Sequence, residues 1–189
     1  MHLSTIENLL KNPIIAAAQH ENLKSAVESK VSSIILINGR LNSLMEEEFL
    51  LLSKKRNIFL HIDLIKGLSN ERESVDFIKN HINAAGIVST KSTILRAAKK
   101  KGLITIQRIF LIDSSSLRNS IDSIKENDPD IVEVMPALVY PIFEELKNEI
   151  KKPIIFGGLI NDSNMISEIL KCGAAGVSCS KSSLWNLDT

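Results

Sequence analysis

The sequence predicts an α/β fold: a compact (β/α)8 TIM-like barrel in which the last helix is truncated or missing. Three observations support this prediction. Eight short runs rich in Ile and Val recur along the chain, segments with helical spacing separate them, and successive runs begin about 23 residues apart. Near-continuous apolar runs are typical of parallel strands that are buried on both faces. An open flavodoxin-like sheet is the alternative, but it usually has only about five or six strands.

The expected strands follow one another at regular intervals. Their ranges are 13–17, 33–37, 58–63, 85–89, 103–108, 131–135, 153–157 and 176–180. A capping-box pattern, Ser4-x-x-Glu7, predicts a short helix before the first strand, where it would cover the bottom of the barrel. Only about 14 residues remain from Gly176 onward, which is too few for a full eighth helix in a barrel of this kind.

Helices are expected between the strands because apolar residues recur there at intervals of three and four. Val75, Ile78 and Ile82 are an example before the fourth strand. Ser114 and Asp162 stand where the N-caps of two later helices belong. Each strand is therefore followed by one helix, and right-handed connections of this kind close a barrel.

Composition limits the classes of protein that remain. The chain has 189 residues, 44% of them hydrophobic and 24% charged, which is typical of one folded domain spanning residues 1–189 and excludes a disordered protein. The formal charge of +1 argues against a protein that binds nucleic acid through strong overall charge, although a local basic patch would be compatible with it. Six Phe, one Trp and one Tyr are too few for a platform of several stacked bases.

Cysteine and histidine usage predicts neither disulfides nor a metal site. Cys172 and Cys179 are too few for a disulfide framework, and the four histidines lack metal-binding spacing, so we expect no metal and no cofactor. The N-terminus does not resemble a signal peptide, and no apolar stretch approaches the roughly 20 residues of a membrane span. We therefore expect a cytoplasmic protein with no membrane partner.

Ligand binding in such a barrel is expected at the carboxyl ends of the strands. Charged groups within apolar strands are costly to bury unless they are paired or bind a ligand. The charged residues that need partners at this end of the barrel are Asp63, Lys91, Arg108 and Glu133. The alternative is an ion network that only closes the barrel mouth. With one histidine and one glutamine on the same strand ends, the candidate ligand-binding residues are His61, Asp63, Lys91, Gln107, Arg108 and Glu133.

The loops after the seventh and eighth strands are candidates for phosphate binding. Many barrels bind phosphate there on backbone N–H groups. Gly157 and Gly158 would let the backbone approach a phosphate, while Ser180 would donate a hydroxyl and Lys181 would supply charge. The alternative is that the two glycines only form a tight turn.

Several blocks resemble one known family. They are D-L-I-K-G-L at 63–68, S-T-K at 89–91, Q-R at 107–108 and G-G-L-I at 157–160. Together they resemble the glycerol-3-phosphate-responsive antiterminators, also called glycerol uptake operon antiterminator regulatory proteins, over nearly the whole chain. The resemblance implies a barrel-like bacterial regulator, not an enzyme, whose effector is glycerol 3-phosphate and whose partner is the leader mRNA of a glycerol-utilisation operon.

Two other functions stay open. One is a barrel enzyme that acts on a small phosphorylated sugar or triose, with Lys91 as the Schiff-base former or Glu133 as the base. The other is an inactive barrel that serves as a scaffold for a protein partner. Turnover of a triose phosphate would favour the enzyme, and the absence of any thermal shift with phosphorylated ligands would favour the scaffold.

Basic residues gather at the predicted carboxyl ends of the helices, which lie at the bottom of a barrel. More than half of the 23 Lys and Arg residues are there. Complementing the helix dipoles explains such cations without any further role. The functional hypothesis is that two triplets bind RNA phosphates. These are Lys54, Lys55 and Arg56, and Lys99, Lys100 and Lys101. A homodimer would enlarge this surface, but the sequence leaves the oligomeric state open.

Overall fold

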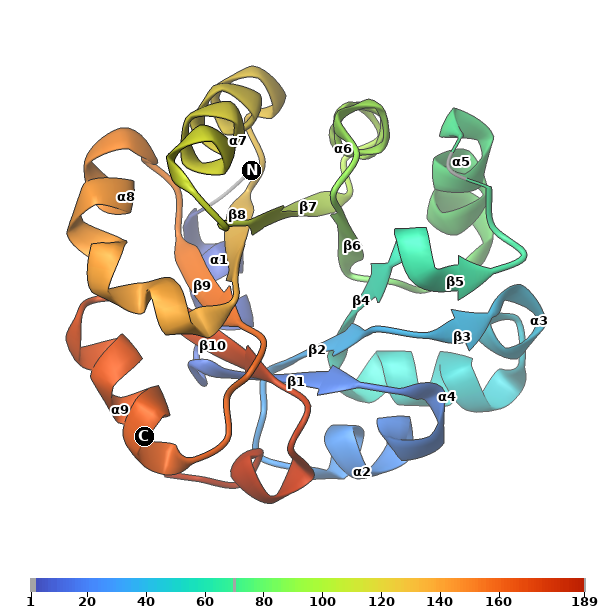
Figure 1. The fold of residues 1–189 in the computed structure, drawn as a ribbon. Coiled ribbons are helices and arrows are strands. Elements are labelled where there is room, and N and C mark those ends of the chain that lie inside the picture. Colours follow the sequence, from blue (N-terminus) through green and yellow to red (C-terminus); the bar gives the residue numbers. More distant parts are fainter. Residues whose placement is uncertain (1–2, 70, 189) are drawn as a thin grey trace.

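Eight parallel strands form a closed barrel in the computed structural model, which describes residues 3–69 and 71–188 (Figure 1). The strand order around the barrel is β1-β10-β9-β8-β7-β6-β4-β2, so the predicted α/β barrel is confirmed. The barrel strands are β1 (Ile14–Ala18), β2 (Ser33–Leu36), β4 (Asn57–His61), β6 (Gly86–Ser89), β7 (Ile104–Phe110), β8 (Ile131–Met135), β9 (Ile154–Gly157) and β10 (Gly176–Cys179).

Helices surround the barrel on the outside (Figure 1). Within the described residues they are α1 (Leu3–Leu9), α2 (Leu23–Glu28), α3 (Leu41–Leu44), α4 (Glu47–Lys55), α5 (Arg72–His81), α6 (Ser92–Lys100), α7 (Ser114–Asn127), α8 (Phe143–Glu149) and α9 (Ser163–Lys171). Short 3-10 turns are η1 (His20–Asn22), η2 (Ile62–Leu64), η3 (Ala137–Ile142) and η4 (Ser182–Leu184). In the described part of the chain only η4 follows β10, which confirms the truncated last helix. None of these helices has the length and apolar character that crossing a bilayer requires.

Of the N-caps predicted for the two later helices, one is correct. Asp162 precedes α9, and its carboxylate accepts a hydrogen bond from the backbone N–H of Met165 at 2.9 Å. The prediction for Ser114 is wrong by one residue. Asp113 caps α7 through a 2.7 Å bond from Ser116, because the backbone of Ser114 is already helical.

Helix α1 closes the bottom of the barrel, as predicted. Ile6, Leu9 and Leu10 pack against the apolar side chains inside the barrel, and the backbone carbonyl of Leu9 accepts a 2.7 Å bond from the Ser33 hydroxyl. The described part of α1 already begins at Leu3, so Ser4 lies within the helix, which corrects the predicted capping position. The apolar lower half leaves the upper half of the interior for polar residues.

A two-stranded sheet that the sequence analysis did not predict stands beside the barrel mouth. It joins β3 (Gly39–Arg40) to β5 (Ile65–Lys66), from the loops that follow β2 and β4 (Figure 1). The predicted strand 58–63 is correspondingly shorter, because the chain turns into η2 after His61. Asp63 therefore leaves the barrel wall and lies on the loop above it.

Candidate functional site

A buried polar cluster occupies the upper interior of the barrel. Arg108 on β7 and Glu133 on β8 stand opposite one another in the sheet register. The Arg108 Nε donates to Glu133 Oε2 at 2.6 Å, and the Ser178 hydroxyl on β10 donates to Glu133 Oε1 at 2.5 Å. Both side chains of the ion pair are almost fully buried, with exposed fractions of 7% and 0%. The predicted need of these charges for partners is thus met inside the barrel.

Gly157 on β9 makes room for this cluster. A Cβ at this position would collide with the Ser178 hydroxyl and with Glu133 Oε1. The absence of a side chain on Gly157 therefore lets Glu133 reach across β9 to Ser178 on β10. Gly157 was predicted as a phosphate contact, and the structure places it beside the buried cluster, where its lack of a side chain leaves room for Glu133 and Ser178.

Two buried nitrogen atoms of the cluster have no hydrogen-bond partner among the described residues. They are Nη2 of Arg108 and Nδ1 of His61. Burial, and secondly the charge of Arg108, lower the pKa of His61 to about 4, so the imidazole is neutral at physiological pH. A buried polar atom without a partner is costly, so these two nitrogen atoms are available to hydrogen-bond with water or with a polar ligand.

Asp63 shapes the loop that follows β6. Its carboxylate accepts bonds from the Ser89 hydroxyl at 2.7 Å and from the Thr90 backbone N–H at 2.8 Å, and the Thr90 hydroxyl adds a third at 3.1 Å. Ser89 in turn accepts from the backbone N–H of Lys91 at 3.0 Å. Lys91 is exposed at the start of α6, so the S-T-K segment is a rigid turn at the rim of the mouth.

Gln107, which was predicted among the ligand contacts, lies apart from the cluster. Side chains alternate along a strand, so a neighbour of the inward-facing Arg108 must face outward. The Gln107 amide donates to the Ser123 hydroxyl at 3.0 Å and accepts from Asn127 at 3.1 Å, both on α7. Gln107 therefore holds α7 against the outside of the barrel through these two hydrogen bonds.

The loops after β9 and β10 meet at the mouth. Gly158 has a φ of +77°, a conformation that favours glycine. The Lys181 ammonium donates to the backbone carbonyl of Asn161 at 2.8 Å and so ties the two loops together. Ser180 is exposed beside Lys181. Three of the four predicted phosphate contacts therefore lie together at the rim, outside the buried cluster.

A second group of cations lies at the same end of the barrel, and the predicted site residues do not include it. A cavity of about 240 Å³ there includes Arg40 and Lys66, which the unpredicted β3–β5 sheet holds in register. The wall also includes Asn38, whose side-chain oxygen accepts a 2.7 Å bond from the His20 backbone N–H. Lys66 belongs to the D-L-I-K-G-L block, and this was the one sequence signal that pointed here.

Both basic triplets lie at the bottom of the barrel, but their surroundings differ. Lys99 and Lys101 form ion pairs with Asp128 and Asp76 respectively. The other triplet, which ends with Arg56, lines a cavity of about 640 Å³. Within the described ranges no group of three or more His, Cys, Asp or Glu side chains is placed to hold a metal ion.

Comparison with known proteins identifies the family. The family model described as glycerol-3-phosphate responsive antiterminator matches residues 14–185. The chain belongs to this family. It is 29% identical over 180 residues to the uncharacterized protein YgcP of Escherichia coli strain K12, covering 95% of this chain and 94% of YgcP. The resemblance that the sequence blocks indicated is confirmed.

Solved structures of antiterminator proteins share the fold. The glycerol uptake operon antiterminator regulatory protein of Listeria monocytogenes has a TM-score of 0.84 and 28% identity, covering 92% of this chain and 95% of that one. A glycerol uptake operon antiterminator-related protein of Thermotoga maritima has a TM-score of 0.79 and 26% identity, covering 91% and 96%. The antiterminator family therefore spans the whole barrel and includes both ends of it.

Proposed function

We propose that this antiterminator-family protein binds glycerol 3-phosphate at the barrel mouth and acts on the leader mRNA of a glycerol-utilisation operon, in the cytoplasm of a bacterium. Family membership supports the effector and the regulatory role. Effector binding would shift the population of the state that is competent to bind RNA.

The observation that carries the effector site is the buried cluster with two unpartnered nitrogen atoms. A polyol hydroxyl can donate to and accept from such groups. Nη2 of Arg108 is a donor, and Nδ1 of a neutral His61 is a donor or an acceptor according to its tautomer. The hydroxyl end of glycerol 3-phosphate would enter the mouth toward these atoms, and its phosphate would stay at the rim.

Two sets of rim residues compete for the phosphate. The first set is the predicted one, with the backbone of Gly158, the Ser180 hydroxyl and the Lys181 ammonium, and barrel loops at this position commonly bind phosphate. The second set is Arg40 and Lys66, whose cavity opens at the same end. We propose the first set, and affinities for the Lys181→Gln and Arg40→Gln variants distinguish the two.

An enzymatic role has less support from the same geometry. Glu133 accepts bonds on both carboxylate oxygens and pairs with a cation, so it is poorly placed to take a proton from a substrate. Lys91 is exposed on the rim, whereas lysines that form Schiff bases are typically desolvated. The buried cluster is thus better suited to binding than to proton transfer.

Calorimetric titration with glycerol 3-phosphate tests the effector site. We expect binding to the unaltered chain, with at least a tenfold loss of affinity in the His61→Asn variant. The matched control is His81→Asn, because His81 is an exposed histidine on α5, far from the cluster. Equal affinity of the two variants would contradict the assigned site.

Transcription through the cognate leader in the presence of the purified chain tests the RNA role. Full-length transcript should increase when glycerol 3-phosphate is added, and glycerol or inorganic phosphate alone should have little effect. Readthrough that ignores the effector, or turnover of glycerol 3-phosphate or a triose phosphate by the chain, would overturn the proposal.

A further inference from the structure

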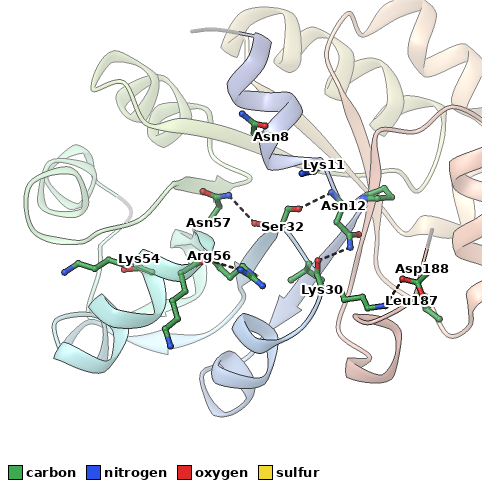
Figure 2. A pocket seen from close by; sticks show the side chains of 14 residues that line it. Asn8, Lys11, Asn12, Lys30, Ser32, Lys54, Arg56, Asn57, Leu187 and Asp188 are labelled. Atoms are coloured by element: carbon green, nitrogen blue, oxygen red, sulfur yellow. Dashed lines mark hydrogen bonds and ion pairs between the residues drawn. The ribbon is translucent and has the colours of Figure 1, made fainter.

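A cavity of about 640 Å³ opens at the bottom of the barrel, at the opposite end from the mouth (Figure 2). Its walls come from the end of α1 and the segment that joins it to β1, from the turn before β2, from the end of α4 and the start of β4, and from the segment after η4. We call it the base cavity. Its lining residues are Asn8, Lys11, Asn12, Pro13, Lys30, Val31, Ser32, Ser53, Lys54, Lys55, Arg56, Asn57, Leu187 and Asp188.

Hydrogen bonds hold the walls of the base cavity in place. The Asn12 amide donates to the backbone carbonyl of Lys30 at 3.0 Å, and the Asn12 backbone N–H donates to the Ser32 hydroxyl at 3.1 Å. Asn57 donates to the Ser32 carbonyl at 3.2 Å (Figure 2). The Arg56 guanidinium donates to the Ser29 carbonyl at 3.1 Å, so this cation is fixed at the cavity wall.

The charge of the base cavity is strongly positive. Five of its lining residues are cationic and only one, Asp188, is acidic. Asp188 pairs with Lys30 at 2.6 Å, and with 90% of its side chain exposed this pair is weak enough to be displaced. Among the described residues no carboxylate lies within ion-pair distance of Lys54 or Lys55.

Helix dipoles alone do not account for this arrangement. They favour cations at each helix end separately, and they do not require cations from several elements to line one cavity. The lysines in the other basic part of the bottom are neutralised by carboxylates, since Asp128 lies between Lys99 and Lys152 and Asp76 pairs with Lys101. A phosphate would meet carboxylates there, whereas at the base cavity Asp188 is the one carboxylate among the described lining residues.

We propose that the base cavity binds a single-stranded segment of the leader RNA; this inference rests on the proposed function. Lys54, Lys55 and Arg56 would contact phosphates along the rim, and Lys11 a phosphate at the opposite wall. Amide and hydroxyl groups of the lining can hydrogen-bond to base edges and to the 2′-hydroxyl, which are accessible in unpaired RNA. The lining residues include no aromatic side chain, so recognition relies on hydrogen bonds and charge rather than on stacking.

Asp188 gives the inference a second, opposite consequence. Its carboxylate forms an ion pair with Lys30 and so neutralises a cation that an RNA phosphate would otherwise contact. Removal of this negative charge should therefore strengthen RNA binding, whereas removal of the lysines should weaken it. A cavity with a purely structural role predicts neither effect.

The test measures binding of the full chain to its labelled cognate leader RNA at several salt concentrations, with saturating glycerol 3-phosphate. For Lys54→Gln/Lys55→Gln we expect at least a tenfold higher Kd and a salt slope smaller by about 0.7 for each lost phosphate contact. For Asp188→Asn we expect a Kd that is lower by about twofold to fivefold at low salt, as the loss of one repulsive charge allows.

Two matched variants sharpen the test. Lys99→Gln/Lys101→Gln removes two charges from the neutralised part of the bottom, and Lys24→Gln/Lys79→Gln removes two exposed lysines elsewhere. Both should change the Kd less than threefold. Unaltered calorimetric binding of glycerol 3-phosphate shows that each variant is folded, and Arg56 is left in place because its guanidinium holds the wall.

The outcomes separate this inference from the proposed function. If the Lys54/Lys55 variant keeps both affinity and salt slope, or if the Lys99/Lys101 variant loses equally much, the base cavity is not the RNA site, although the regulator still stands. A duplex that competes as well as a single strand of the same sequence would also overturn it. Absence of any effector-dependent RNA binding by the unaltered chain would instead overturn the proposed function.

Discussion

Replacing Glu133 by glutamine should destabilise the barrel strongly, although the two side chains have nearly the same shape. The change removes the charge opposite Arg108, whose side chain is 7% exposed, and leaves a cation inside the barrel. Removing one partner of a buried ion pair typically costs about 3–5 kcal/mol. We expect the lower end, about 3 kcal/mol, because the glutamine oxygen can still accept one of the two bonds that Glu133 now accepts.

Unfolding in urea at neutral pH measures this change. The single tryptophan, Trp185, is buried and donates to the Cys179 carbonyl at 2.8 Å, so its fluorescence reports on the closed barrel. At about 2–4 °C per kcal/mol for a domain of this size, the midpoint of thermal unfolding should fall by about 6–12 °C. The matched control is Glu149→Gln, which breaks an exposed pair with Lys125 and should cost less than about 1 kcal/mol.

The difference in the free energy of unfolding between Glu133→Gln and Glu149→Gln tests whether Glu133 is needed to compensate the buried charge of Arg108. If Glu133→Gln and Glu149→Gln changed the free energy of unfolding equally, the charge on Arg108 would be compensated by some other group. Breaking the buried Arg108–Glu133 pair would then cost no more stability than breaking the exposed Lys125–Glu149 pair. A loss confined to effector affinity, with stability unchanged, would point to the same error.

Three further predictions follow from other buried groups. The pKa of His61 is lowered to about 4 from an ordinary value of 6.5, so between these pH values the unfolded chain binds a proton that the folded chain excludes. The free energy of unfolding should therefore fall as the pH falls from about 6.5 to 4. Unfolding in urea across this range should show a smaller fall for His61→Asn. Gly157→Ala should lower the free energy of unfolding by about 1–3 kcal/mol because the new Cβ overlaps the Ser178 hydroxyl, and an unchanged free energy of unfolding would refute the packing argument. Burial raises the pKa of the Cys179 thiol to about 11, so in the native protein iodoacetamide at pH 8 should alkylate the half-buried Cys172 first; mass spectrometry of the labelled peptides tests the order.

The barrel was predictable because each of its units is local. An apolar run, a turn and an amphipathic segment specify a strand and its helix within about 23 residues, and the closing geometry follows from repetition. The β3–β5 sheet was not predictable in this way. It pairs Arg40 with Lys66 across α3, α4, β4 and η2, and neither dipeptide alone carries a strand signal.

The candidate site was predictable to the extent that strand alternation decides it. Arg108 and Glu133 had to find partners, and the sheet register makes them partners of one another. Gln107 could not be separated from Arg108 by sequence, because two adjacent polar residues at a strand end carry no sign of which one faces inward. The basic triplets also look alike in sequence, and only distant carboxylates such as Asp128 distinguish them.

The two proposed sites lie at opposite ends of one short strand. Asn57, at the start of β4, lines the base cavity, and His61, at its end, belongs to the buried cluster of the mouth. A five-residue strand paired on both sides is too stiff to carry a gradual deformation, so communication requires two discrete arrangements of the barrel. Linkage then demands reciprocity: whatever factor glycerol 3-phosphate adds to RNA affinity, RNA must add to the affinity for glycerol 3-phosphate. A factor of one would mean that the two sites are not coupled through the barrel.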